Sequence, residues 1–174
     1  MKRIGLLSDT HSHWDDRYIT YFSECDEIWH VGDIGTLQLA DRLKEIAHLR
    51  AVYGNIDGTD IRCEYPETLR FMCEDVEVLM KHIGGYPGRY DRSIYHELVS
   101  RPPKLFISGH SHILKVMMDK HLGVLHINPG AAGVYGQQPV RTLIRFTIDG
   151  SNIKDLEVVE LGSKCCVTTQ TDKP

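Results

Sequence analysis

Apolar and polar residues in the first half of the chain alternate between the spacing of strands and the spacing of helices. Short apolar runs with the length of buried strands lie at residues 3–8, 27–31 and 50–53. Residues 15–25 and 36–48 carry apolar side chains at helical spacing, with Thr36 as the expected N-cap of the second segment. Strands and helices in this order predict parallel strands joined by right-handed crossovers.

The second half of the chain has the pattern of antiparallel pairs. A hairpin is expected around residues 73–75, and a helix is expected at 91–99. The expected strands cover residues 69–72, 76–81, 104–108, 115–119, 124–128, 142–148 and 153–161. Together the two halves predict a mixed β core of two packed sheets with helices outside.

The length of the chain, 174 residues, is enough for one domain with a substantial core. We expect this domain to cover residues 1–162, followed by a polar tail at 163–174. The net charge is −4 and the Lys and Arg residues are scattered, so we expect no binding to duplex nucleic acid. A negatively charged substrate would therefore need local cations, supplied by side chains or by metal.

The apolar stretch near the N-terminus, residues 4–7, is far too short for a signal peptide or a membrane span. This predicts a cytoplasmic protein without a membrane partner. The cysteines are odd in number and lack the spacing of a disulfide framework, which predicts free thiols at Cys25, Cys63, Cys73, Cys165 and Cys166.

Residues of the kind that bind metals follow several expected strands, at the point where each strand ends. They are Asp9 and His11, Asp33, Asn55, His82, and the pair His110 and His112. Each alone has an ordinary structural role, for example Asp9 as an N-cap, Asp33 as a turn residue or His82 as a hydrogen-bonded core histidine. Because five strand ends carry such residues, and ligand sites form at the carboxyl edge of sheets, we interpret the set as one site.

The ligand types indicate which metal would bind. Carboxylates, imidazoles and one amide, without cysteine, suit Mn, Fe, Ni, Co or Zn better than they suit a thiolate zinc site or an all-oxygen calcium site. Seven ligands are too many for one ion. Two ions about 3.5–4 Å apart would use them if one carboxylate bridges, as in centres that displace groups at phosphorus.

In order and combination these residues resemble the calcineurin-like metallophosphoesterase superfamily. The matching motifs are Asp9-x-His11, Gly32-Asp33, Gly54-Asn55, His82 and Gly109-His110-x-His112. Length and motif spacing are most similar to the small one-domain phosphodiesterases of bacteria and archaea. The resemblance implies an α/β fold, a four-layer α/β/β/α sandwich with two mixed β-sheets flanked by helices, and metals at the strand ends.

The resemblance also implies how the ligands divide between two divalent ions, of which manganese is the first choice. One ion would be held by Asp9, His11, Asp33 and His112, and the other by Asp33, Asn55, His82 and His110. Asp33 would then bridge the ions and position a hydroxide that attacks a small phosphate-ester substrate. The expected activity is that of a dinuclear phosphodiesterase, and the resemblance leaves room for a homo-oligomer.

Three residues near these motifs refine the prediction. Asp57 is a candidate catalytic residue that orients a ligand or the attacking water, and a solvated turn carboxylate is the alternative. Arg89, in the glycine-rich loop after His82, is a candidate for binding the substrate phosphate, and a plain surface loop is the alternative. Ile56 stands where many superfamily members have histidine, and an alkyl side chain cannot donate a proton to a leaving group.

Two other functions use the same residues. A phosphomonoesterase would need the same ions and would differ only in the shape and charge of its pocket. A non-catalytic interaction module is the alternative from another class, since the retromer subunit of this fold resembles such enzymes but departs at the metal positions. Here every expected ligand is present, which favours the enzyme.

Overall fold

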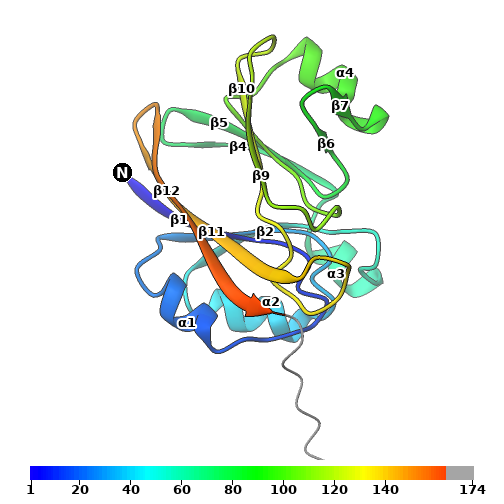
Figure 1. Cartoon of the computed structure of the whole chain (residues 1–174), viewed down its shortest axis with the longest axis vertical. Coiled ribbons are helices and arrows are strands. Elements are labelled where there is room, and N and C mark those ends of the chain that lie inside the picture. Colours follow the sequence, from blue (N-terminus) through cyan, green and yellow to red (C-terminus); the bar gives the residue numbers. More distant parts are fainter. Residues whose placement is uncertain (164–174) are drawn as a thin grey trace, which may run out of the picture.

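Two five-stranded sheets that pack face to face form the centre of the fold (Figure 1). The structure is a computed structural model, and it describes residues 1–163. The first sheet has the order β12-β11-β1-β2-β3 and consists of β1 (Lys2–Leu7), β2 (Glu27–Val31), β3 (His48–Val52), β11 (Val140–Asp149) and β12 (Asn152–Ser163). The second has the order β4-β5-β8-β10-β9 and consists of β4 (Thr68–Cys73), β5 (Val76–Lys81), β8 (Leu105–Ile107), β9 (Lys115–Asp119) and β10 (Val124–Asn128).

Helices cover the outer face of each sheet. The first sheet carries α1 (Arg17–Phe22), α2 (Leu37–Lys44) and α3 (Thr59–Glu64), and the second carries α4 (Arg92–Ser100). Their apolar side chains pack against the strands, for example Phe22 and Leu43 on the first sheet and Leu98 on the second. These layers confirm the predicted α/β/β/α sandwich with two mixed sheets. No helix within residues 1–163 has both the length and the apolar character needed to cross a membrane.

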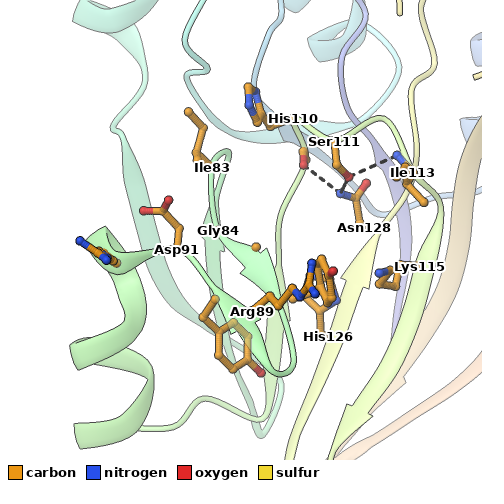
Figure 2. Close-up of a pocket in the computed structure, with 15 residues that line it drawn as sticks. Ile83, Gly84, Arg89, Asp91, His110, Ser111, Ile113, Lys115, His126 and Asn128 are labelled. Carbon is orange, nitrogen blue, oxygen red and sulfur yellow. Dashed lines mark hydrogen bonds between the residues drawn. The ribbon is translucent and has the colours of Figure 1, made fainter. Parts of the chain in front are cut away.

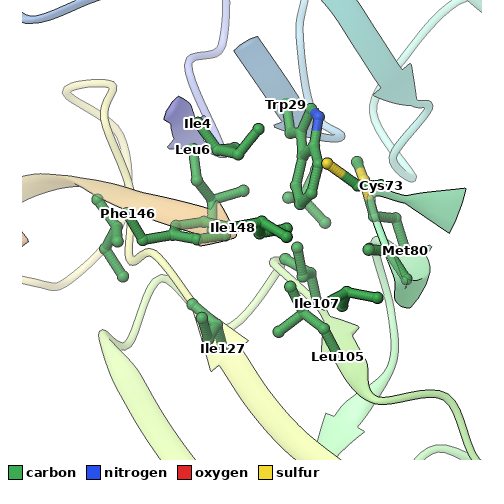
Figure 3. Packing of buried hydrophobic residues seen from close by; sticks show 14 of the residues in the cluster. Ile4, Leu6, Trp29, Cys73, Met80, Leu105, Ile107, Ile127, Phe146 and Ile148 are labelled. Atoms are coloured by element: carbon green, nitrogen blue, oxygen red, sulfur yellow. The ribbon is translucent and has the colours of Figure 1, made fainter. Parts of the chain in front are cut away.

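Apolar side chains from both sheets fill the space between them (Figure 3). Leu6 of β1 and Leu105 of β8 are fully buried in this layer. The ring of Trp29 meets those of Phe71 and Phe146 edge to face, with centroid distances of 5.1 and 5.6 Å. Because every second side chain of a strand enters this close-packed layer, the strands are rigid supports for the loops at their carboxyl ends.

Several elements differ from their predicted bounds. The helix expected over 36–48 is too long, because α2 ends at Lys44 and β3 begins at His48. Thr36 occupies the N-cap, but its side chain makes no capping hydrogen bond. The sequence does not predict α3 or a small hairpin formed by β6 (Gly85–Tyr86) and β7 (Arg89–Tyr90), because elements of six and two residues are too short to show a periodic pattern.

The cysteines within the described residues are free. Cys25, Cys63 and Cys73 form no disulfide, as predicted. Cys165 and Cys166, with the rest of the expected tail after residue 163, lie outside the described residues.

The parallel pairing of β8 in the second sheet positions the loops that follow β5 and β8. The pairs β9–β10 and β11–β12 are antiparallel as predicted, but β8 pairs in parallel with both β5 and β10. The segments after β5 and β8 therefore leave the sheet side by side, and the N–H of Gly109 donates to the carbonyl of His82 at 2.9 Å. This contact brings His82 next to the loop that carries His110 and His112.

We predict that Leu105→Ala lowers the free energy of unfolding by about 2–5 kcal/mol, because it opens a cavity in the fully buried layer between the sheets. Urea unfolding followed by tryptophan fluorescence measures the change. Val116→Ala, at an exposed position of β9, is the control and should shift the free energy by less than about 0.5 kcal/mol. Equal losses in the two variants would contradict the packing described.

Candidate metal centre

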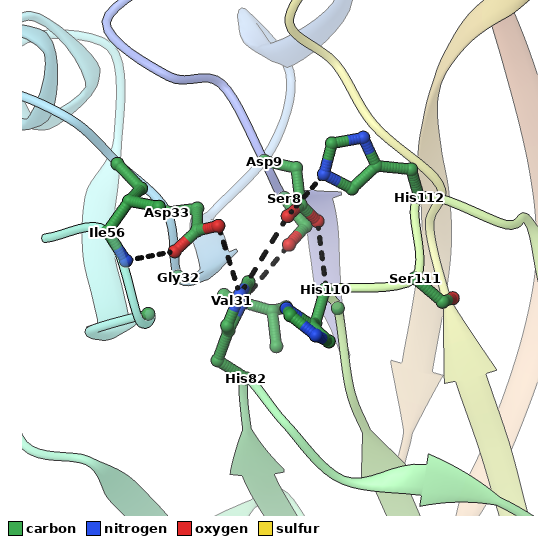
Figure 4. Close-up of polar contacts among 12 residues, drawn as sticks. Ser8, Asp9, Val31, Gly32, Asp33, Ile56, His82, His110, Ser111 and His112 are labelled. Atoms are coloured by element: carbon green, nitrogen blue, oxygen red, sulfur yellow. Dashed lines mark hydrogen bonds and ion pairs between the residues drawn. The ribbon is translucent and has the colours of Figure 1, made fainter. Parts of the chain in front are cut away.

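Six of the seven predicted ligands come together where the strands end. Figure 4 shows five of them: Asp9, Asp33, His82, His110 and His112. They form two groups, and within each group the ligand atoms lie within 4.8 Å of one another. The first group is Asp9, His11 and His112, and the second is Asp33, His82 and His110. Each group contains three members of one of the two ligand sets that the resemblance implies, and the binding of ions by these sets stays a prediction.

The loops that carry the two carboxylates support each other through the backbone. Asp9 and Asp33 each lie two residues beyond the end of a central strand, β1 or β2, and these strands pair in parallel. The N–H of Asp9 donates to the carbonyl of Gly32 at 3.0 Å, and the N–H of His11 donates to the carbonyl of Asp33 at 2.9 Å. The carboxyl ends of neighbouring parallel strands thus present both acids at one edge of the sheet.

Asp33 belongs to the second group and also faces the first. Its Oδ2 atom is 3.3 Å from Nε2 of His82 and 3.8 Å from Nε2 of His11. Its Oδ1 atom accepts a hydrogen bond from the N–H of Ile56 at 3.1 Å, which fixes the rotation of the carboxylate. A carboxylate that faces imidazoles of both groups has the placement that a bridging ligand needs.

Two of the histidines are oriented by backbone carbonyls. Nδ1 of His82 donates to the carbonyl of Val31 at 2.6 Å, and Nδ1 of His112 donates to the carbonyl of Tyr135 at 3.1 Å. Because a carbonyl only accepts, Nδ1 carries the proton in both rings and Nε2 keeps its lone pair. This arrangement is the usual support of a metal-binding histidine.

Two buried atoms of the site make no hydrogen bond within the described residues. Nε2 of His82 and Oδ1 of Asp9 have no hydrogen bond, although their side chains are 2% and 0% exposed. Oδ1 of Asp9 is 3.1 Å from Nε2 of His112 and 3.9 Å from Nε2 of His82, close to both but without hydrogen-bond alignment. Buried polar atoms of this kind need a partner, and a divalent cation fits this set of oxygen and nitrogen donors.

The pKa shifts differ among the ligands: burial lowers the pKa of His11, while the pKa of Asp33 is lowered and that of His82 is raised by their facing charges. Burial alone would raise the pKa of Asp33, but the imidazole of His82, the N–H of Ile56 and the imidazole of His11 together outweigh burial, so the pKa is lowered. Burial alone would lower the pKa of His82, and the carboxylates of Asp33 and Asp9 reverse this shift. The carboxylates therefore stabilise a cation at Nε2 of His82, a place that a proton or a metal ion can take.

The backbone of the ligand loops adopts a conformation that residues other than glycine rarely take. Five of the six grouped ligands have positive φ angles, between 47° and 63°: Asp9, His11, Asp33, His110 and His112. Each such residue costs roughly 1 kcal/mol, although Asp and His tolerate this region better than most residues. Clustered strain at one edge of a sheet is typical of a functional site.

Glycines next to the ligands make room for their side chains. A Cβ atom on Gly54 would lie 2.1 Å from Oδ1 of Asp33, and one on Gly32 would lie 2.7 Å from the ring of His82. Gly54 has no positive φ angle, so close approach alone explains the requirement for glycine there.

The seventh predicted ligand, Asn55, lies beside the site. It follows Gly54 after β3, is exposed, and lines a hollow of about 390 Å³ together with His82. Its role as a ligand stays a prediction.

Asp57 has a different environment from the one expected. Its side chain is 3% exposed and accepts hydrogen bonds from the N–H groups of Ile34 at 3.2 Å, Gly35 at 2.8 Å and Gly54 at 2.8 Å. Asp57 thus joins the loop after β2 to the loop after β3, and these three hydrogen bonds of its carboxylate all come from backbone N–H groups. The geometry supports a positioning role, in place of the solvated turn carboxylate that the sequence allowed as an alternative.

Arg89 lies in β7, is exposed, and lines a hollow of about 540 Å³ that also contains His110. The structure therefore places Arg89 within reach of a molecule bound beside the second ligand group. Its contact with substrate stays a prediction.

Two supporting residues are not predicted from the sequence. Nδ1 of His30 accepts from the N–H of Gly32 at 3.2 Å, and its Nε2 donates to Oγ1 of Thr10 at 2.9 Å, so this ring joins the loops after β1 and β2. Burial lowers the pKa of His30 to about 4, which keeps it neutral. Arg62 donates to the carbonyl of Asp57 at 2.7 Å and to that of Asn55 at 3.1 Å. A histidine between the apolar residues Trp29 and Val31 of an expected buried strand is the sequence signal that could have pointed to His30.

Ligand groups of this composition at the carboxyl ends of a two-sheet sandwich define a protein of the metallophosphoesterase type. A family model described as the calcineurin-like phosphoesterase superfamily domain matches residues 1–151, so the chain belongs to that superfamily. This confirms the resemblance found in the motifs, and it supports metal-dependent hydrolysis of phosphate esters.

Relatives and solved structures agree with this assignment. The chain is 26% identical over 170 residues to a probable metallophosphoesterase of Methanothermobacter thermautotrophicus, covering 94% of this chain and 95% of that protein. A solved structure described as a novel archaeal phosphodiesterase has a TM-score of 0.71 at 23% identity, covering 90% of this chain and 99% of that one. Wild-type Vps29 of Entamoeba histolytica, solved with Zn²⁺, has a TM-score of 0.70 at 18% identity, covering 91% and 98%. At these identities the two structures show that the fold is shared.

We predict that Gly54→Ala weakens the binding of Mn²⁺ at least about tenfold, because the new methyl group displaces the Asp33 carboxylate. Isothermal titration calorimetry on metal-free protein measures the affinity. Gly58→Ala is the matched control, since its nearest neighbour is the flexible end of Asp60 at 3.1 Å. If the two variants bind the metal equally well, the close contact of Gly54 has no role at the site.

Asp57→Asn tests the positioning role. The amide group would face backbone N–H groups, so we expect the metal-free protein to lose about 1–3 kcal/mol of unfolding free energy. Thermal and urea unfolding measure the loss, with the exposed Asp60→Asn as control. Unchanged stability together with lost hydrolysis would instead favour a direct role of Asp57 in catalysis.

Proposed function

We propose that this protein is a phosphodiesterase that works with two divalent metal ions. The observation that carries the proposal is the pair of ligand groups, with Asp33 of the second group also facing the first. Asp9, His11 and His112 would hold one ion, His82, His110 and Asn55 the other, and Asp33 both. Manganese is the first choice, and nickel, iron, cobalt and zinc suit the same donors.

Two such ions, when bound, polarise the phosphate oxygens and lower the pKa of water so that hydroxide is the nucleophile. The chain supplies the geometry. Asp33 is fixed by the N–H of Ile56, and the rings of His82 and His112 are fixed by carbonyls, so little reorganisation is needed during the reaction. No side chain has to act as the nucleophile.

The choice of a diester rests on the space around the site. His82 lines one hollow of about 390 Å³ and His110 lines another of about 540 Å³. Two hollows that each contain a ligand give room for the two ester groups of a phosphodiester. A monoester would fill one of them, so phosphomonoesterase activity is the second candidate.

Ile56 limits how the leaving group is assisted. Its backbone N–H holds Asp33, while its side chain is 48% exposed and cannot donate a proton. We therefore expect esters with acidic leaving groups, such as aryl esters, to be the better substrates.

The non-catalytic alternative is disfavoured by the retained ligand groups. Six ligand side chains are assembled with orientations that suit metal binding, at the cost of strained backbone. A module that binds another protein through a different surface has no need for them.

Metal removal tests the proposal. We expect hydrolysis of bis(4-nitrophenyl) phosphate to disappear after treatment with chelator and to return with Mn²⁺. Asp33→Asn should reduce the rate of the Mn²⁺-loaded protein at least about a hundredfold, because the bridging carboxylate is lost. Asp75→Asn, an exposed acid in the turn between β4 and β5, is the control. Activity that ignores the chelator would refute the proposal.

A further inference from the structure

The larger hollow beside the second ligand group is a pocket with walls from three elements (Figure 2). The β6–β7 hairpin forms one side, β9 forms another, and His126 and Asn128 of β10 contribute to its lining. The pocket begins at His110 and has a volume of about 540 Å³, which is within the range of small-molecule sites. A molecule bound at the metals can therefore extend into it.

The charged side chains of this pocket are mostly positive. Arg89, Arg92 and Lys115 line it, with Asp91 as its carboxylate. Asp91 is already engaged, since it caps α4 and accepts hydrogen bonds from the N–H of Ser93 at 2.9 Å and from its hydroxyl at 2.6 Å. The pocket therefore has an excess of positive charge that its own acid does not neutralise.

Lys115 and Arg89 have no carboxylate partner within 4.0 Å among residues 1–163. Nζ of Lys115 lies 3.4 Å from the centre of the Tyr86 ring, so this ammonium group is held across the pocket from β9 to β6. The contact restrains Lys115 without neutralising its charge. Such a cation is ready to bind an anion from a ligand.

His126 shows that the pocket lining has a hydrogen-bonding atom without a partner. Its side chain is 1% exposed, and Nε2 pairs with the hydroxyl of Ser108 at 2.9 Å. Nδ1 is buried and has no partner among the described residues. Burial lowers the pKa of His126 to about 4, with a smaller effect of Lys115, so the ring is neutral. The hydroxyl of Ser108 donates to the carbonyl of Gly85 at 3.0 Å, so Nε2 of the neutral ring donates to that hydroxyl and Nδ1 is an acceptor. Nδ1 therefore offers nothing to an anion, and the attraction for one rests on the cations of the pocket.

We propose that this pocket binds a second anionic group of the substrate, and that Lys115 and Arg89 select diesters that carry it. The anion belongs to the ester group that remains in the pocket while the other ester group leaves. This inference rests on the proposed phosphodiesterase activity and names its substrate class: diesters with a carboxylate or phosphate on one arm.

Three synthetic esters test the proposal. All release 4-nitrophenol, and the retained group is phenyl, 3-carboxyphenyl or 4-(phosphonomethyl)phenyl. With Mn²⁺-loaded protein we expect kcat/KM to be at least about tenfold higher for an anionic ester than for the phenyl ester. The comparison of carboxylate with phosphonate identifies which anion is preferred. Equal kcat/KM values for all three esters would overturn the proposal.

Variants connect the preference to the pocket. Lys115→Gln should reduce the ratio of kcat/KM between anionic and neutral esters, and Lys115→Gln combined with Arg89→Gln should bring it close to one. Lys120→Gln is the matched control, because Lys120 is an exposed lysine just after β9 and outside this pocket. A preference that survives in the double variant would show that other residues are responsible.

A binding measurement separates this inference from the proposed function. In metal-free protein the metal site keeps the negative charges of Asp9 and Asp33 without a metal cation to offset them, so we expect it to attract a phosphonate less than the pocket does. We expect benzylphosphonate to bind the metal-free wild type in calorimetry and to bind the double variant at least about tenfold more weakly. Failure of hydrolysis with this binding intact would refute only the phosphodiesterase, whereas equal binding to both proteins would refute the anion pocket.

Discussion

Two carboxylates, Asp9 and Asp33, are almost completely buried at the edge where the sheets meet, and their charge needs compensation. The facing groups are imidazoles, and no lysine or arginine forms an ion pair with either acid in the described part of the chain. A metal cation held between the two carboxylates offsets the free energy of burying their charge better than protonation does, because the oxygens and ring nitrogens already converge on one place. The positive φ angles, the glycines and the loop contacts all serve to hold these acids in place.

The cost of this arrangement is met by the rest of the fold. Strained backbone at five ligands and buried anions destabilise the edge of the sheets, while the close-packed layer between the sheets stabilises the strands that carry it. Asp57, Arg62 and His30 transmit that rigidity to the loops through backbone hydrogen bonds. The site is therefore preorganised by neighbours that need not touch a substrate.

The sequence predicts much of this because strand ends are readable from apolar runs, and ligand types such as His110 and His112 stand out against them. The pattern predicts two packed sheets with helices outside, and the resemblance to the superfamily implies the four-layer sandwich and the division of the ligands between two ions. The sequence cannot show that Asp57 faces the backbone, because the donors from Ile34 and Gly35 are 23 and 22 residues away along the chain. Nor can it show that β8 runs parallel to β5, or that Lys115 meets Tyr86, because these contacts depend on how distant segments pack.

Anomalous diffraction from crystals grown with Mn²⁺ tests the central claim most directly. The account predicts two manganese peaks about 3.5–4 Å apart, with Asp33 coordinating both. A single peak held by one group, or manganese bound away from Asp33, would contradict it.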